Sequence, residues 1–324
     1  MQELLFAAGV AFFIALLIGP LIIPVLRRLK FGQSIRREGP KRHYAKAGTP
    51  TMGGIIILIA LLLSSLLYAG KSPEVWLALF VTLGHGVLGF LDDFIKVALK
   101  RSLGLKARQK LFGQIILAVA LAYIATTYMG RGTDLWIPVL GMNLDLGPFY
   151  YVLIFFVLVG TTNAVNLTDG LDGLAAGTTI VAAVAYAVIA LAFAKPELAA
   201  FCVALAGATL GFLRFNAYPA KVFMGDTGSL ALGGALASVA VMTKTELLLI
   251  LVGGVFVIEA LSVIIQVVSF KTTGKRVFLM SPIHHHFELS GWPEVKVVTV
   301  FWLAGVAFSV LALAILSVSR GGGI

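Results

Sequence analysis

Ten long apolar runs divide this chain, and they constrain its fold more than any other feature of the sequence. Each run has roughly 17 to 25 residues, which is enough for a helix to cross a hydrocarbon core about 30 Å thick. Because the runs are continuously hydrophobic and do not alternate, they argue against a β-barrel. The sequence therefore predicts an all-α integral membrane protein with about ten transmembrane helices, near residues 4–26, 53–69, 74–91, 111–128, 149–166, 173–193, 198–213, 228–243, 246–270 and 297–318.

The composition agrees with a membrane protein. Hydrophobic residues make up 59% of the 324 residues and charged residues only 12%, with a mean hydropathy of +0.99, whereas about a quarter of the residues in a soluble domain are charged. The first run follows Glu3 and no basic region, so we interpret it as a retained span and not as a signal peptide. Neither a linker nor an internal repeat divides the sequence, and we expect a single polytopic domain over residues 1–324.

The distribution of lysine and arginine predicts the orientation in the membrane. Twenty of these 25 residues lie in the odd-numbered connections between the runs, and five lie on the other side. By the positive-inside rule the odd connections are cytoplasmic, and an even number of spans then puts both termini in the extracytoplasmic space. The isoelectric point of about 9.8 is therefore a topology signal and a contact with anionic membrane lipids, with no role in binding nucleic acid.

On the outer side, the connection 129–148 is the one of notable length. Its apolar residues alternate around 140–143, a pattern that predicts a small extracytoplasmic hairpin.

The most polar stretch between two runs is 163–173, which carries two carboxylates, two carboxamides and two glycines. Asp169 and Asp172 are three residues apart, so from the start of a helix they face one point. Such a point suits a divalent cation or the polar part of a nucleotide sugar. An isolated Asp-Gly pair is more often an ordinary turn, so this stretch alone decides little.

Two further acidic motifs occur in the connections predicted to be cytoplasmic. Asp92 and Asp93 stand at the membrane edge, where adjacent carboxylates repel one another unless a cation or a proton lies between them. If the helix continues, Asp92 and Lys96 share a face and pair. Asp226 lies between glycines just before a helix, which suits a metal ion next to a phosphate or a simple helix cap. Because three acidic motifs reach one membrane face from three connections, we predict that they converge, with Asp226 and Asp92 as metal ligands.

The remaining polar motifs fit anionic substrates. Backbone amides at the glycine-rich helix start near 48–54 are placed to receive an anion, with Lys46 and Thr51 beside them; a basic loop before a helix is the simpler interpretation. His284, His285 and His286 are neighbours in sequence, which rarely bind one ion together, so we expect them to hydrogen-bond a phosphate or a sugar. Glu259 and a histidine of the third run lie at membrane depth, where ionisable groups are either functional or buried in structural pairs.

Taken together, segments 89–96, 163–173 and 225–229, Asn216 and the three histidines resemble the polyprenyl-phosphate N-acetylhexosamine-1-phosphate transferase superfamily. Segments 48–54 and 282–289 are similar to one family within it, the phospho-N-acetylmuramoyl-pentapeptide transferases (MraY).

The resemblance implies that phospho-MurNAc-pentapeptide passes from UDP-MurNAc-pentapeptide to undecaprenyl phosphate with Mg²⁺, forming lipid I and UMP in peptidoglycan synthesis. It also implies a cytoplasmic active site in the bacterial inner membrane, and it allows a homodimer. Among the motif residues, we assign the catalytic roles to Asp92, Asp93 and Asp226. Substrate binding is assigned to the other motif residues, which are Lys46, Thr51, Lys96, Asn166, Asp169, Asp172, Asn216, His284, His285 and His286.

Two other functions compete with this one. A sister transferase would use UDP-N-acetylglucosamine with the same acidic motifs, but segment 282–289 argues against it. An ion-coupled transporter would place polar groups near the midplane on broken helices, whereas here nearly all of them lie on one face.

For the transfer we favour direct attack by the lipid phosphate. A phosphate monoester is mostly dianionic at neutral pH, so Asp92 or Asp93 would only orient it or remove its residual proton. A covalent aspartyl-phosphate is the alternative mechanism.

Overall fold

The computed structural model describes residues 2–29, 46, 48–99 and 104–320. Most of the first basic connection, over 30–45, lies outside these residues. The described chain is built mainly from helices, which are α1 (Gln2–Arg28), α2 (Gly54–Tyr68), α3 (Pro73–Ala98), α4 (Ala107–Tyr123) with a π-helical turn (Ile124–Tyr128), α5 (Phe149–Thr168), α6 (Leu174–Ala192), α7 (Pro196–Asn216), α8 (Gly225–Met242), α9 (Glu246–Val252), α10 (Gly254–Thr273), α11 (Ile283–Leu289) and α12 (Glu294–Ser319).

Each predicted apolar run coincides with one of these helices or with a consecutive pair of helical segments. Within the described residues, eight helices are long and apolar enough to cross a membrane, as expected for a multi-pass membrane protein. Helix α2 is apolar but shorter than these eight. The number of membrane crossings and the side on which the termini lie stay predictions.

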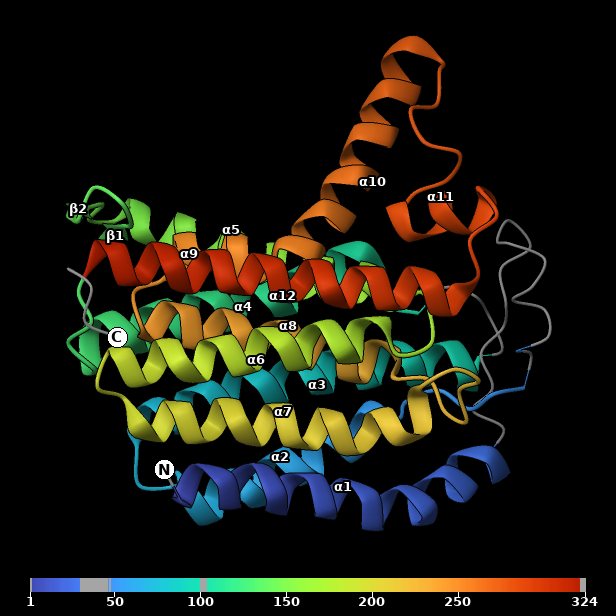
Figure 1. The fold of residues 1–324 in the computed structure, drawn as a ribbon, viewed down its shortest axis with the longest axis horizontal. Coiled ribbons are helices and arrows are strands. Elements are labelled where there is room, and N and C mark those ends of the chain that lie inside the picture. The colour runs from blue at the N-terminus through green and yellow to red at the C-terminus, as the bar shows by residue number, and fades with distance from the viewer. Residues whose placement is uncertain (1, 30–45, 47, 100–103, 321–324) are drawn as a thin grey trace.

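The prediction of one continuous helix over 246–270 is wrong, because the structure divides this run at Gly253 into α9 and α10. Consecutive glycines permit a sharp bend, and a β-carbon on Gly254 would lie only 2.6 Å from the ring of Phe308 in α12. Hydropathy reports an apolar run but not its direction. As a result α10 leaves the bundle and projects from it (Figure 1).

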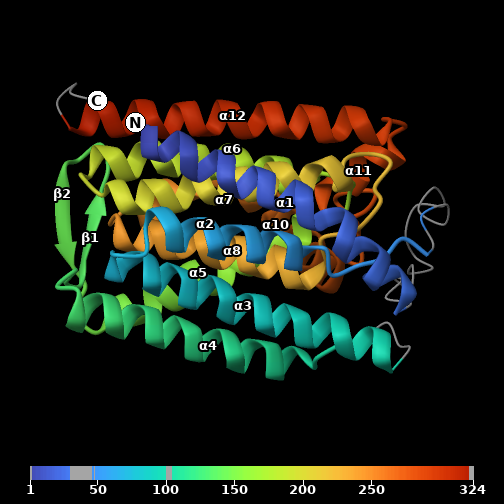
Figure 2. The same cartoon turned by 90° about the horizontal axis from the view of Figure 1, so that it is seen from below.

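The predicted hairpin is confirmed as two antiparallel strands, β1 (Asp134–Ile137) and β2 (Met142–Asp145). It lies at one end of the bundle together with the start of α1 and the end of α12, and α11 lies at the other end (Figure 2). The single cysteine, Cys202, is buried within α7, as the apolar run around it predicts.

Small residues bring α3 and α8 together at the end opposite the hairpin. A β-carbon on Gly89 of α3 would lie 2.0 Å from the carbonyl oxygen of Asp226, so only glycine permits this approach. Likewise, Gly54 of α2 packs directly on Gly228 of α8. Close backbone contact of this kind is typical of helices in membranes, and here it places the last turns of α3 beside the first turn of α8.

Candidate active site

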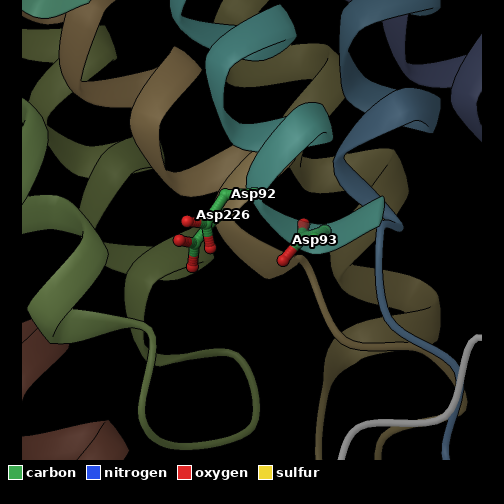
Figure 3. A group of neighbouring side chains, drawn as sticks. All are labelled: Asp92, Asp93 and Asp226. Carbon is green, nitrogen blue, oxygen red and sulfur yellow. The ribbon is translucent and has the colours of Figure 1, made fainter. Parts of the chain in front are cut away.

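Three carboxylates meet where α3 and α8 touch. Asp92 and Asp93 come from α3, Asp226 comes from the first turn of α8, and their ligand oxygens lie within 4.8 Å of one another (Figure 3). Asp92 and Asp93 are buried, with 4% and 3% of their surface exposed. The predicted convergence of these two motifs is therefore a feature of the structure.

Two lysines lie among these carboxylates. The Nζ atom of Lys96 is 2.5 Å from Oδ2 of Asp92, 3.8 Å from Oδ1 of Asp93 and 3.2 Å from Oδ2 of Asp226. Lys110 of α4 also reaches Oδ2 of Asp226, at 2.9 Å. Three carboxylates and two lysines leave a negative charge in the group, and carboxylate oxygens are the donors that Mg²⁺ prefers. The residues present thus fit a divalent cation.

Asp92 and Asp93 are held in place by different backbone groups. Oδ2 of Asp93 accepts hydrogen bonds from the backbone N–H of Thr227 at 3.0 Å and from its hydroxyl at 2.8 Å, so Asp93 ties α3 to the start of α8. Oδ1 of Asp92 accepts a hydrogen bond from the backbone N–H of Leu105 at 2.9 Å. Each aspartate therefore keeps one oxygen for its own backbone partner and presents the other to the group.

Residues of the 163–173 stretch also reach the carboxylates. The amide of Asn166 in α5 donates to Oδ1 of Asp226 at 2.9 Å and to the hydroxyl of Ser229 at 2.8 Å. Asp169 forms a hydrogen bond with the backbone of Gly225, and desolvation together with the negative charges of Asp226 and Asp93 raises its pKa well above the usual range. Both side chains therefore lie at the edge of the carboxylate group.

Asp172 belongs to a second polar cluster, formed with Lys46 and Glu294. Lys46 is 2.7 Å from Asp172 and 2.6 Å from Glu294. Desolvation opposes the charge of Lys46, but its pKa is raised because two carboxylates hydrogen-bond and attract it. The second oxygen of Asp172 accepts a hydrogen bond from the backbone N–H of Ala220 at 2.9 Å.

The expectation that Asp169 and Asp172 face one point from a helix start is therefore wrong. Both lie in the turn before α6, which begins only at Leu174, and the turn ends at Gly173 with a φ of 80°. A turn of this kind has no helical periodicity, so a spacing of three residues does not align the side chains.

The anion cradle, which was the alternative to a basic loop at the start of α2, is also wrong. The backbone N–H groups of Gly53 and Gly54 donate to the carbonyl oxygens of Phe223 and Met224, each at 2.9 Å, so they are not free for an anion. Thr51 is 6% exposed, and its hydroxyl lies against Gly225. These contacts instead join the start of α2 to the segment that carries Asp226.

Asn216, at the end of α7, connects two loops. Its Oδ1 accepts a hydrogen bond from the N–H of Gly173 at 3.1 Å, and its amide donates to the carbonyl of Val222 at 3.0 Å. The side chain is 2% exposed and holds the turn of Asp172 beside the segment that leads to Asp226.

The three histidines of α11 have three different sets of partners. Nδ1 of His284 is 3.0 Å from Glu259, Nδ1 of His285 is 2.8 Å from Glu288, and Nδ1 of His286 accepts a hydrogen bond from the backbone N–H of Leu279 at 3.2 Å. The rings of His284 and His285 lie close together, with centroids 4.1 Å apart, but among the residues that the structure describes the three Nδ1 atoms have no partner in common. Within the described part of the chain, the three-residue group that fits a metal ion is the carboxylate group.

Comparison with known proteins identifies the family. Residues 75–244 match the family described as glycosyl transferase family 4, and residues 46–58 match a phospho-N-acetylmuramoyl-pentapeptide-transferase signature. Relatives that carry this name are 58% identical over 325 residues in Desulfitobacterium hafniense, covering 96% of this chain and 97% of the relative, and 57% identical over 318 residues in Bacillus subtilis, covering 97% and 98%. A third, from Geobacillus kaustophilus, is 59% identical over 318 residues with the same coverage.

The chain belongs to the phospho-N-acetylmuramoyl-pentapeptide-transferase family.

The matched segments of this transferase family cover most of the site. The signature contains Lys46 and Thr51, and the longer match contains all three carboxylates together with Asn166, Asp169, Asp172 and Asn216. The substrate contacts assigned to these residues and to the histidines stay predictions.

Some residues of the site were not singled out from the sequence. Lys110 is one of six basic residues in the connection 92–110, and Glu294 begins the last helix without any motif around it. Thr227 and Ser229 belong to segment 225–229, which carries part of the resemblance, but no role was predicted for either residue. The partners of all four residues come from distant parts of the chain, so no local sequence pattern reveals these contacts. The one signal for them was the polar composition of the connections in which the four residues lie.

Proposed function

We propose that the chain transfers phospho-MurNAc-pentapeptide from UDP-MurNAc-pentapeptide to undecaprenyl phosphate, forming lipid I and releasing UMP. The observation that carries this proposal is the meeting of Asp92, Asp93 and Asp226 with two lysines at one end of a bundle of apolar helices. The identity of the relatives, which extends over nearly the whole chain, supports the choice of substrates.

The physical requirements of this reaction match the site. One reactant is a nucleotide sugar dissolved in the cytosol, and the other is a phosphate on a long apolar chain held by the membrane. Both are anions, so the task is to neutralise phosphate charge and to align the attacking and leaving oxygens. A site at the end of the helices, opposite the hairpin, serves both reactants if that end faces the cytoplasm of the bacterial inner membrane.

Asp226 and Asp92 would hold Mg²⁺, with Asp93 beside them. Bound there, the ion would neutralise negative charge on the phosphates. Lys96 and Lys110 lie on the same carboxylates and add positive charge next to an arriving pyrophosphate.

In the transfer, an oxygen of undecaprenyl phosphate forms a bond to the phosphorus that carries the sugar. The bond from this phosphorus to the oxygen of the UMP phosphate breaks, and its electron pair leaves with UMP. Asp92 and Asp93 each have one oxygen bound by the backbone and the other facing the group, so we assign the orientation of the lipid phosphate, and removal of its residual proton, to one of these two aspartates. Asn166 keeps Asp226 in place through Oδ1.

An assay of the purified chain in lipid vesicles tests this function. We expect UMP release only when UDP-MurNAc-pentapeptide, undecaprenyl phosphate and Mg²⁺ are all present, and none without the lipid acceptor. Turnover of UDP-N-acetylglucosamine in place of the pentapeptide substrate would indicate the sister transferase. A stoichiometric burst of UMP from thoroughly delipidated protein would contradict direct attack and favour a covalent aspartyl-phosphate.

A further inference from the structure

Helix α10 carries a buried polar stripe on an otherwise apolar helix. Glu259, Ser262 and Gln266 are 0%, 2% and 9% exposed, and their spacing of three and four residues puts them on one face. Gln266 holds the returning chain, since its Oε1 accepts hydrogen bonds from the N–H groups of Val277 and Phe278, each at 2.9 Å. Ser262 donates to the carbonyl of Glu259 at 2.7 Å. On this stripe, Glu259 is the residue that brings a carboxyl group to membrane depth, where ionisable groups are energetically unfavourable and usually functional.

The partner of Glu259 is the first histidine of α11. Oε1 of Glu259 lies 3.0 Å from Nδ1 of His284, and both side chains are fully buried. The second oxygen, Oε2, and the second ring nitrogen, Nε2 of His284, have no hydrogen-bond partner among the described residues. A single hydrogen bond therefore fixes the orientation of the imidazole ring.

The other edge of this ring supports the turn between α5 and α6. A β-carbon built on Gly170 would lie 2.3 Å from Nε2 of His284 and 2.8 Å from Cε1, so the ring packs directly on the backbone of Gly170. This glycine follows Asp169 and stands two residues before Asp172. The position of the ring thus determines how closely the turn that carries both aspartates approaches α11.

We propose that Glu259 is a positioning residue of the transferase site, which holds His284 so that its ring supports Gly170 and fixes the placement of Asp169 and Asp172. The inference rests on the proposed function, because it assigns Asp169 and Asp172 to the nucleotide-sugar side of the site. Glu259 acts through His284 and does not touch the substrate, since both side chains are buried.

A plain packing role would not need this pair. Apolar residues of similar volume fill a buried site at least as well as a buried ionic pair, whereas a hydrogen-bonded pair specifies one orientation of the ring. For histidines that bind metal ions, loss of the partner that orients the ring typically costs on the order of 10- to 100-fold, and we take the lower end of this range for His284.

The test uses variants of similar size in the full-length protein. Glu259→Leu keeps the volume and removes the acceptor for His284, and Glu259→Gln keeps an acceptor. Ser262→Ala is the matched control on the same stripe. We expect Glu259→Leu to raise the KM for UDP-MurNAc-pentapeptide on the order of 10-fold, with the KM for undecaprenyl phosphate unchanged. Glu259→Gln should recover most of this loss, and Ser262→Ala should behave as wild type.

A double variant separates positioning from general disturbance. If Glu259 acts only through His284, then Glu259→Leu in a His284→Ala background causes no further rise in this KM. An additive effect, a wild-type KM in Glu259→Leu, or an equal loss for both substrates would overturn the proposal. Should Glu259→Leu fail to accumulate, Glu259→Ala is tested in the same two backgrounds.

Calorimetric binding of UDP-MurNAc-pentapeptide keeps the two proposals distinguishable. If the wild type binds this nucleotide sugar but releases no UMP, the proposed function fails, and the binding constants of the Glu259 variants still decide the positioning role. Weaker binding in Glu259→Leu than in Glu259→Gln supports that role, and equal binding in both variants contradicts it.

Discussion

Buried charges are arranged differently at the two ends of the helical bundle: in matched ion pairs at one end, and in a group of like charges at the other. At the hairpin end, Arg131 forms an ion pair with Glu246 and donates from Nε to the carbonyl of Val241 at 2.8 Å, and the hydroxyl of Tyr150 donates to Glu246 at 2.7 Å. Lys244 meets Asp134 at 2.7 Å. Arg131 and Lys244 thus each have a carboxylate of their own. At the other end, three carboxylates lie within 4.8 Å of one another, and two lysines share Asp226.

This difference separates a structural charge from a functional one. A matched ion pair needs nothing further, and breaking it leaves a buried charge that destabilises the fold. A group of like charges is held together by the surrounding helices and is relieved when a cation arrives. Neutralising one carboxylate of the group removes its repulsion with the other two as well as its attraction to the lysines, so it should cost less stability than at the hairpin end. Neutralisation at the hairpin end should cost little turnover.

The largest effect is expected for Asp226→Asn. Removing a charge that acts on the transferring phosphate should lower kcat by at least about 100-fold, while binding of UDP-MurNAc-pentapeptide and the unfolding temperature change little. Rates of UMP release and calorimetry measure both. Near-normal turnover in the folded variant would remove Asp226 from the reaction.

At the hairpin end, Glu246→Ala should produce the reverse pattern. Leaving Arg131 buried without its carboxylate is expected to cost about 3–5 kcal/mol of stability, with kcat per folded molecule unchanged. Unfolding in detergent or lipid measures the loss, and the Arg131→Met, Glu246→Leu double variant should recover part of it. A large fall in kcat without a stability change would show that the two ends are not separate.

A lysine from each end sharpens the comparison at smaller scale. Lys110→Met should lower kcat/KM by roughly 10-fold or more, since its charge acts beside the phosphates. Lys244→Met, which removes a half-exposed ion pair with Asp134, should cost at most about 1 kcal/mol of stability and no activity. Equal kinetic effects of the two variants would contradict the assignment of Lys110 to the site.

Much of this fold could be predicted because the bilayer imposes it locally. The helices follow from apolar runs, and the hairpin follows from alternation around residues 140–143. The convergence of Asp92 and Asp93 with Asp226 could be predicted because the hydropathy pattern places both motifs at the same predicted membrane face.

What could not be predicted depends on contacts between distant segments. The bend at Gly253 depends on the packing of Phe308, and the pairing of Lys46 with Glu294 joins residues 248 positions apart. Asp169 and Asp172 were assigned to one point because a turn was treated as a helix. The amides of Gly53 and Gly54 were considered for an anion because their actual acceptors, the carbonyls of 223–224, are distant in sequence and could not be foreseen.

The orientation of the two ends in the membrane can be tested without an activity measurement. Asn143 in the hairpin and Lys275 after α10 are both exposed. Asn143→Cys should react with a membrane-impermeant thiol reagent in intact cells, and Lys275→Cys should react only after the membrane is opened. The native Cys202 is buried and should not react. Labelling of Lys275→Cys in intact cells would reverse the predicted topology.

Metal binding tests the central claim, that the carboxylate end holds the divalent cation, without reliance on turnover. Mn²⁺ can report on the Mg²⁺ site through electron paramagnetic resonance. We expect the wild type to bind one Mn²⁺ that Mg²⁺ displaces, Asp226→Asn to lose this binding, and the Arg131→Met, Glu246→Leu variant to keep it. Unchanged Mn²⁺ binding in Asp226→Asn, or its loss in the hairpin-end variant, would contradict the account.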